Sequence, residues 1–257
     1  MNIKRFLTQE EPYYNTESDI VEFIKKYNSK YKTLYYKKKT QEVLRLINFP
    51  IENKNILDIG CCAGYFSIGL AKKGGNITGI DSSEYAIAAA KHNAKLNNVE
   101  CKFIKEDFNV AEFDDKFDLI IAKDVIEHIE EDVEFLKKIK SILKENGEVI
   151  IATQNSFSFN YFFEGAIRKL LGQKRWIGWD STHLRWYSPW KLKRKFKAAG
   201  LKVEGFSSSY FFPYEMLKVL TKKSPRNKFY TLIDDNLGNK KPFSGMGWSI
   251  SAKGRQV

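Results

Sequence analysis

Three acidic residues lie at or near the ends of short apolar runs in the first half of the chain. Asp58 lies in NILDIG, Asp81 ends NITGID, and Asp107 ends CKFIKED. The first run leads into a tight turn, GCCAG (60–64), with two glycines four positions apart. Glycine in such a turn lets the backbone approach a ligand closely because no Cβ intrudes. Carboxylates beside the turn can accept hydrogen bonds from ligand hydroxyl and amino groups. These residue types indicate a site for a nucleoside-like ligand.

The charge beside this turn argues against a dinucleotide. A pyrophosphate is usually held by a Gly-x-Gly-x-x-Gly turn at a helix N-terminus. Here the middle glycine is missing, and Asp58 would place a negative charge near the phosphates. S-adenosylmethionine fits better, because it has no phosphate and carries an ammonium and a sulfonium group. Asp81 ends the next apolar run after Gly60, where an acid accepts hydrogen bonds from a ribose diol. Asp107 and Phe108 could receive the adenine amine and ring.

A second group of residues could act on a methyl acceptor. Asp124, Glu127 and His128 are spaced i, i+3 and i+4, which predicts one helical face. They could bind Mg²⁺ or another divalent ion, with His183 as a distant fourth ligand, and so lower the pKa of an acceptor hydroxyl. Alternatively, His128 is a lone general base, and His183 contacts or deprotonates the acceptor. Structural roles at a helix N-terminus are a third interpretation, and Asp124 could contact the cofactor with no metal.

The elements that must position these residues alternate between strand and helix. Apolar runs predict strands at 55–60, 76–81, 101–107, 117–124 and 148–153. Between them lie predicted helices, one closed by Gly74, one capped by Ser82 or Ser83, and one over 132–147 that ends at Gly147. The pattern predicts an α/β fold with a Rossmann-like, doubly wound, mainly parallel sheet and helices on both faces. Ligands bind such sheets past the carboxyl ends of the strands, where these acids lie.

The rest of the chain is expected to build on this core as a single domain, residues 1–257. Residues 1–54 read as an N-terminal helical cap, with Thr40 as a helix N-cap, and 55–154 as the cofactor-binding core. Residues 155–257 read as an aromatic, basic substrate lid followed by a helix that begins at Pro189 and two further strands. Two strands added to five give a predicted sheet of seven.

Charge is unevenly spread along the chain. The net charge is +12, and residues 155–257 hold 20 Lys and Arg against 6 Asp and Glu. A basic, aromatic segment indicates a phosphorylated or lipid-linked acceptor, a nucleic acid or peripheral contact with an anionic membrane, although a solvated lysine-rich surface would look the same. No run is long and apolar enough to span a bilayer, and the N-terminus is unlike a secretory signal. Three cysteines, two of them adjacent, suit a reducing cytoplasm rather than a disulfide framework.

Longer stretches carry a resemblance. NILDIGCCAGYFSIGLAKKGGNITGIDSS, followed by IKEDF and FDLIIAKDVIEHI, resembles the class I S-adenosylmethionine-dependent methyltransferases over about residues 50–155. DVIEHI and STHLRWYSPWKLKRKFKAAGL are similar to the ubiquinone-biosynthesis type of O-methyltransferase, in which some relatives use acid-x-x-Glu-His as a metal site. The turn departs from that family's usual GxGxG at Cys62. The cofactor-binding residues that the resemblance implies are Asp58, Gly60, Cys62, Gly64, Asp81, Ser82, Asp107, Phe108, Lys123 and Asp124.

The sequence therefore predicts an S-adenosylmethionine-dependent methyltransferase that acts on a hydroxyl of a small quinone-, lipid- or sugar-like molecule. An RNA methyltransferase is the first alternative, motivated by the basic C-terminal portion. A non-catalytic cofactor-binding partner subunit is the second. Neither the acceptor nor the oligomeric state can be read from the residues.

Overall fold

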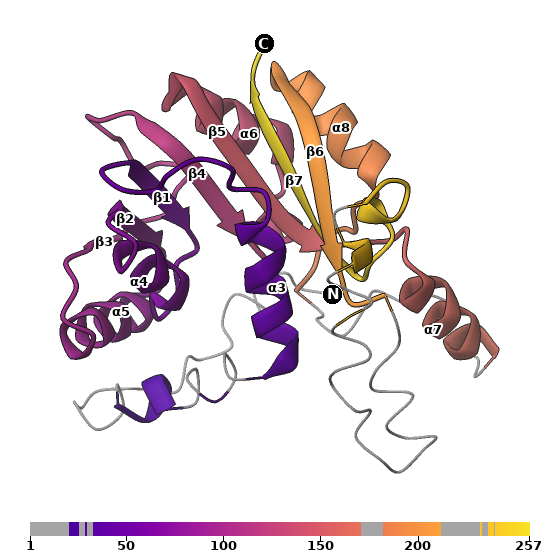
Figure 1. Ribbon diagram of the computed structural model, residues 1–257, viewed down its shortest axis with the longest axis horizontal. Helices are drawn as coiled ribbons and strands as arrows, with labels where there is room; N and C mark the ends of the chain where they lie inside the picture. Colours follow the sequence, from indigo (N-terminus) through magenta and orange to yellow (C-terminus); the bar gives the residue numbers. More distant parts are fainter. Residues whose placement is uncertain are drawn as a thin grey trace.

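The computed structural model describes residues 21–25, 29, 33–170, 182–211, 232, 236–238 and 240–257. Its strands are β1 (Asn55–Ile59), β2 (Asn76–Asp81), β3 (Lys102–Lys105), β4 (Phe117–Lys123), β5 (Leu143–Gln154), β6 (Leu201–Ser209) and β7 (Ser249–Gln256). They form one sheet in the order β3-β2-β1-β4-β5-β7-β6 (Figure 1). β1 to β5 run parallel, whereas β7 is antiparallel to both β5 and β6. The predicted seven-stranded, mainly parallel sheet is confirmed.

Helices cover both faces of this sheet. They are α3 (Leu34–Leu44), α4 (Tyr65–Ala71), α5 (Glu84–Leu96), the 3₁₀ turn η1 (Ile126–His128), α6 (Asp132–Ser141), α7 (Phe159–Leu170), α8 (Pro189–Ala198) and the 3₁₀ turn η2 (Phe243–Gly245). Successive side chains of a strand point to opposite faces. Ile120 of β4 therefore packs with α6 and α8, while Leu119 and Ile121 pack with α3 and α4. Figure 1 shows α3 in front of the sheet and α6 and α8 behind it.

Several predicted helix ends are confirmed because they depend on local chemistry. Ser83, one of the two predicted caps, accepts a hydrogen bond from Ala86 N at the start of α5. Ser188, which was not predicted as a cap, accepts one from Lys191 N at the start of α8. Pro189 is the first residue of α8. Gly74 and Gly200, which follow α4 and α8, have φ values of +85° and +71°. Both values lie in the left-handed region that favours glycine after a helix.

Two predicted boundaries were wrong. Thr40 lies inside α3, which begins earlier, at Leu34. The helix predicted over 132–147 ends at Ser141, and β5 begins at Leu143, so Gly147 lies in a strand. The reason is tertiary: Leu143 pairs with Phe117 of β4, and the register shifts before the next paired residues. Strand pairing on a central strand outweighs the weak helix preference of the residues after Ser141.

A buried polar cluster fastens α3 to the sheet. Glu42 is fully buried and accepts hydrogen bonds from the hydroxyls of Ser209, Ser249 and Ser251, at 2.6, 3.2 and 2.6 Å. Burial raises the pKa of Glu42 to about 7, although the three serines and Lys39 oppose the shift. A carboxyl group can be buried this deeply because both of its oxygens are hydrogen-bonded. The helix thus has a fixed place on the face of β6 and β7.

The segment after β5 holds α7, which extends away from the sheet (Figure 1). Phe159, Phe162 and Phe163 of α7 are 61%, 58% and 52% exposed. Residues 171–181 of the predicted lid lie outside the described residues. In the part of the chain that is described, no helix is both long and apolar enough to cross a bilayer. The division of one domain at residues 54 and 154 stays a prediction.

Candidate functional site

The carboxyl ends of the central strands meet at one edge of the sheet. β1, β2, β4 and β5 are parallel, so Asp81, Asp124 and the end of β5 all lie at the edge where β1 enters the glycine turn. The backbone N–H groups of Gly60 and Cys61 both donate to Ile80 O, at 2.8 and 3.1 Å. This pair of bonds holds the turn against the end of β2. The sheet therefore brings together residues that are far apart in sequence, as expected for a doubly wound fold.

The turn after β1 uses left-handed backbone at three positions. Gly60, Cys62 and Gly64 have φ values of +69°, +49° and +74°. A Cβ on Gly60 would lie 2.6 Å from Val125 Cγ2, and one on Gly64 would lie 3.0 Å from Phe103 Cζ. The positions that side chains of residues 60 and 64 would occupy are therefore filled by other side chains of the protein, and they are not open to a ligand. Cys62 adopts a conformation that costs a non-glycine residue about 1–2 kcal/mol.

Asp58 is a buried carboxyl group just before the turn. It is 2% exposed, and Oδ2 accepts a hydrogen bond from Ser67 Oγ of α4 at 2.6 Å. Burial raises the pKa of Asp58 to about 6, and the negative charge of Asp81 adds to the rise. Ser67 and the positive charge of Lys123 oppose it. A carboxyl group whose pKa is raised in this way becomes ionised when a cation binds beside it, because the cation lowers the pKa again.

Asp81 joins the turn to the loop after β2. Its Oδ2 accepts from Cys62 N at 2.9 Å, and its Oδ1 accepts from Ser83 N at 3.0 Å. Burial raises the pKa of Asp81, while these two N–H donors oppose the rise. Ser82, between them, is exposed. Each carboxylate oxygen can accept a second hydrogen bond, so Asp81 retains capacity for two ligand hydroxyls.

The third strand ends differently from the first two. Asp107 is exposed, and its Oδ1 accepts hydrogen bonds from the backbone and side-chain nitrogens of Asn109, at 2.8 and 3.0 Å. Phe108 is only 6% exposed and packs edge-on against Phe135 at 5.2 Å between ring centroids. Lys138 Nζ lies 5.4 Å from the Phe108 ring centroid. Phe108 is thus part of the main core, and its predicted contact with an adenine ring stays a prediction.

Asp124, at the end of β4, does not belong to the predicted helical face. Its φ of +59° is not helical, so Asp124 lies outside any right-handed helix. The following 3₁₀ turn contains only residues 126–128. The Asp124 carboxylate forms an ion pair with Lys39 of α3, whose side chain is 1% exposed. Burial would raise the pKa of Asp124, but Lys39, Lys123 and His183 outweigh it and hold the pKa below its usual value. The predicted common helical face of Asp124, Glu127 and His128 is therefore wrong.

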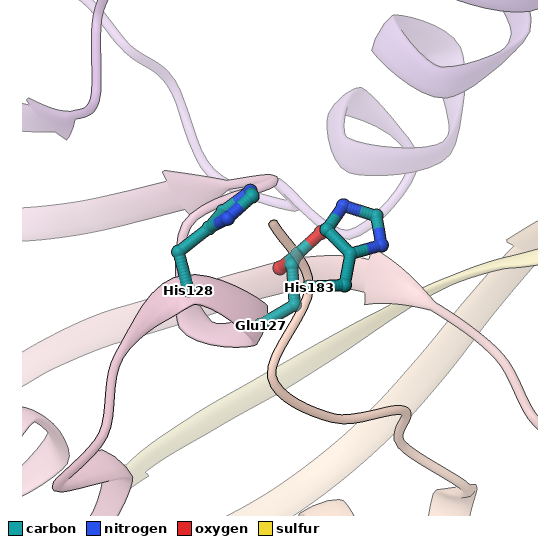
Figure 2. A group of neighbouring side chains, drawn as sticks. All are labelled: Glu127, His128 and His183. Atoms are coloured by element: carbon teal, nitrogen blue, oxygen red, sulfur yellow. The ribbon is translucent and has the colours of Figure 1, made fainter. Parts of the chain in front are cut away.

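A different trio comes together instead. One ligand atom each of Glu127, His128 and His183 lies within 4.8 Å of the other two. Figure 2 shows Glu127 and His128 on the η1 turn and His183 reaching them from a separate segment. The imidazole centroids of His128 and His183 are 4.9 Å apart, with the rings nearly edge to face. The sequence named all three residues but placed His183 as a distant fourth ligand, because it lies far along the chain from the other two.

Glu127 is the carboxyl group of this trio. It is 1% exposed, and Oε2 accepts from Thr153 Oγ1 at 2.9 Å. Oε1 is also buried and has no hydrogen-bond partner among the described residues. Burial and the nearby charge of Asp124 raise the pKa of Glu127 to about 8, although Lys39 and Thr153 oppose the rise. A buried, unpaired carboxyl oxygen beside two imidazoles is an arrangement that functional sites maintain and cores avoid.

Three residues of this edge were missed by sequence reasoning: Lys39, Ser67 and Thr153. No site residue was predicted in the run YYKKKT. However, Lys39 stands four and seven positions before Val43 and Leu46, which are both buried. That helical spacing could have placed Lys39 on the buried face. No comparable signal marked the two hydroxyl groups.

Aromatic side chains extend outward from His183. Its ring centroid lies 6.3 Å from that of Trp186, which lies 5.0 Å from Tyr161 and 5.1 Å from Trp248. Tyr161 in turn lies 6.1 Å from Phe162, an exposed residue of α7. A continuous series of rings thus links the trio to the exposed face of α7.

A groove of the described structure lies away from this site. It has a volume of about 830 Å³ and is lined by residues at the amino-terminal edge of the sheet, among them Asn55, Asn76 and Phe117. None of the predicted site residues lines it. The polar residues that line it are exposed or half-buried, unlike the buried carboxyl groups at the glycine turn.

Comparisons with known proteins agree with this arrangement. Residues 51–181 match a family model described as a methyltransferase domain. The ubiquinone biosynthesis O-methyltransferase of Pelagibacter ubique is 32% identical over 120 residues, covering 47% of this chain and 50% of that protein. The protein of the same name from Rickettsia typhi is 29% identical over 147 residues, covering 57% and 58%. The chain thus spans only about half the length of these curated relatives.

A solved structure extends the likeness over the whole fold. Magnesium protoporphyrin IX methyltransferase from Synechocystis PCC 6803, crystallised with bound SAH, superposes with a TM-score of 0.60. The match covers 95% of this chain and 96% of that one, at 15% sequence identity. At this identity the likeness concerns the fold alone.

Proposed function

Because this chain belongs to the family defined by that methyltransferase domain, we propose that it transfers a methyl group from S-adenosylmethionine to a hydroxyl of a small molecule. The names of the relatives from Pelagibacter and Rickettsia support O-methylation. They favour neither an RNA methyltransferase nor a non-catalytic cofactor-binding subunit.

The observation that carries this proposal is the pair of carboxyl groups at the glycine turn. Asp58 and Asp81 lie close enough for the charge of Asp81 to raise the pKa of Asp58. A diphosphate placed here would be repelled by both, whereas the ammonium and sulfonium groups of S-adenosylmethionine would be attracted. The two hydrogen-bonding positions left on Asp81 suit a ribose diol.

We assign the remaining cofactor contacts from this starting point. Gly60, Cys62 and Gly64 shape the turn around the methionine part, Asp107 and Phe108 lie toward the adenine, and Ser82 is near the ribose. Lys123 and Asp124 flank the sulfonium. When bound, the cofactor supplies a methyl group on a good leaving group, so aligning the acceptor with it accounts for much of the acceleration.

Cofactor affinity is expected to depend on pH through Asp58. Its pKa of about 6 in the ligand-free protein means that the carboxyl group is ionised above pH 6 and neutral below it. The ammonium of the cofactor favours the ionised form, so affinity should fall by about tenfold for each pH unit below 6. Calorimetric titration with S-adenosylmethionine between pH 5 and 8 measures this. Asp58→Asn should bind weakly with no such dependence, and NAD should not bind; tight NAD binding would contradict the proposed cofactor.

We further propose that Glu127, His128 and His183 bind the acceptor side, with a divalent ion between them. The unpaired Oε1 of Glu127 fits this role. Ligand atoms about 2.1 Å from one ion lie no more than about 4.2 Å apart, so the observed limit of 4.8 Å requires only a small adjustment. Two imidazoles beside one carboxylate suit Zn²⁺ or Mn²⁺ better than Mg²⁺, which prefers oxygen ligands. Such an ion lowers the pKa of a bound hydroxyl.

One histidine acting alone is the alternative. His128 is exposed, and its Nδ1 is 3.2 Å from the hydroxyl of Thr182. That contact leaves Nε2 available to accept a proton from an acceptor hydroxyl. His183 is 9% exposed and lies against Trp186, which suits it to orient the acceptor. The two models differ in how many of the three side chains turnover requires.

The series of aromatic rings supports an apolar acceptor. An acceptor whose hydroxyl is at the trio would extend past Trp186 and Tyr161 to α7, where three phenylalanines are exposed. A lipid-linked or quinone-like molecule suits such a surface, and peripheral contact of α7 with an anionic membrane would assist its entry. All three cysteines are free thiols, which supports a reducing compartment such as the cytoplasm.

The class of acceptor is expected to appear in a labelling experiment. The protein is incubated with methyl-labelled cofactor and a cell extract, which is then separated into solvent-extractable, aqueous small-molecule and RNA fractions. Label should enter the solvent-extractable fraction, and Asp81→Ala protein is the control. Label confined to RNA would contradict the proposal, and the absence of transfer into any fraction would favour the cofactor-binding partner.

A further inference from the structure

The segment that carries His183 is tied to the η1 turn by several hydrogen bonds. We refer to residues 182–187 as the His183 strap. Thr182 Oγ1 lies 3.2 Å from His128 Nδ1, and Leu184 N donates to Glu127 O at 2.9 Å. Both neighbours of His183 are therefore bonded to the other two members of the trio. The strap fixes where His183 can lie.

Its outer end converges on one buried carboxylate, Asp132, the first residue of α6. Tyr187 is fully buried, and its hydroxyl donates to Asp132 Oδ2 at 2.9 Å, with Ile126 O of η1 at 3.2 Å. Arg185 Nη1 lies 3.0 Å from the same oxygen. Lys195 Nζ of α8 binds the other oxygen, Oδ1, at 2.6 Å.

The surroundings of Asp132 stabilise its ionised form. Asp132 is 2% exposed; burial would raise its pKa, but Lys195, Tyr187 and Arg185 together hold the pKa below its usual value. Burial and the Asp132 charge raise the pKa of Tyr187, so its hydroxyl stays protonated and remains a donor. A second bond from the strap, Arg185 Nη2 to Glu130 O at 2.8 Å, reaches the chain between η1 and α6.

We propose that Asp132 is a positioning residue that, through Tyr187 and Arg185, sets the place of His183 relative to Glu127 and His128. The contacts of Asp132 described above are to the strap and α8, so it acts on the trio through these segments and η1. Its three partners come from the strap and α8, and Tyr187 also reaches η1, so one carboxylate aligns every segment that contributes to the trio. The expected effect on kcat rests on the proposed function of the trio. The placement of His183 by Asp132 does not.

Two variants test it: Asp132→Asn, which removes the charge, and Tyr187→Phe, which removes one hydroxyl. Each should lower kcat by about 10–100-fold, the usual effect of disturbing groups that orient a site, and leave the calorimetric affinity for S-adenosylmethionine unchanged. The matched control is Glu148→Gln. Glu148 is a buried carboxylate in the middle of β5, and it binds Lys253 and Arg255 of β7 at 3.2 and 2.8 Å. The Glu148→Gln protein should be less stable than the wild type, without a comparable loss of kcat.

A second readout separates positioning from stability and from activity. The chain has three histidines, His92, His128 and His183, so isotope labelling of histidine gives three imidazole signals by NMR. Asp132→Asn and Tyr187→Phe should shift the signals of His128 and His183 but not that of His92 on α5. Unchanged signals and kcat in both variants, or the same shifts in Glu148→Gln, would overturn the inference. If the wild type transfers no methyl group but the two signals still shift, the proposed function fails and the positioning role stands.

Discussion

Asp81→Ala protein is expected to bind S-adenosylmethionine about a hundredfold or more weakly than the wild type. Two hydrogen bonds from ribose hydroxyls to an ionised acceptor are worth about 1.5–3 kcal/mol each. The substitution also frees Cys62 N and Ser83 N, which Asp81 now holds at 2.9 and 3.0 Å. Calorimetry with S-adenosylmethionine and its demethylated product measures the loss.

A matched control and an analogue distinguish direct contact from support of the turn. Asp118 of β4 likewise accepts a backbone hydrogen bond, from Asn55 N at 2.9 Å, but at the amino-terminal edge of the sheet. Asp118→Ala should therefore keep the wild-type affinity. A 2′-deoxy analogue should bind the wild type more weakly than the natural product does, yet show no further loss with Asp81→Ala. Equal losses in both proteins would mean that Asp81 supports the turn and does not contact the ribose.

Glu127→Gln, His128→Ala and His183→Ala are each expected to lower kcat by about a hundredfold or more, since an ion that polarises a hydroxyl is worth several kcal/mol. A chelator should inactivate the wild type to the same extent and should have little effect on the variants. The affinity for Mn²⁺ or Zn²⁺, measured by calorimetry without acceptor, should rise as the pH approaches 8. The reason is that Glu127, whose pKa is about 8, must lose its proton to bind the ion.

His92→Ala is the control for these variants, because His92 lies on α5, away from the trio. Activity that withstands the chelator and is lost on replacing only one histidine would contradict the metal model. That result would support the single general base instead. Full activity in all three variants would remove the trio from the mechanism.

Much of the fold could be predicted because its signals are local. The apolar runs that became β1, β2 and β4, the serine before α5 and the proline that starts α8 each act within a short stretch of chain. The boundary at Gly147 failed because the pairing of Leu143 with Phe117 is a contact between segments that are distant in the sequence, with all of α6 between them. Sequence reasoning sees helix preference there but cannot see the strand that competes with it.

The candidate site divides in the same way. By itself, the sequence determined that Asp81, Asp107 and Asp124 would lie at the carboxyl ends of parallel strands, because strand direction and alternation fix which edge they share. Only the tertiary structure decided that Lys39 neutralises Asp124 and that His183, not Asp124, joins Glu127 and His128. These pairings close long loops of chain, and their energies depend on burial and on charges from other elements. Residue spacing along one segment reveals neither the burial of a side chain nor the charges that other elements place beside it. The acids could therefore be found from the sequence alone, but their partners could not.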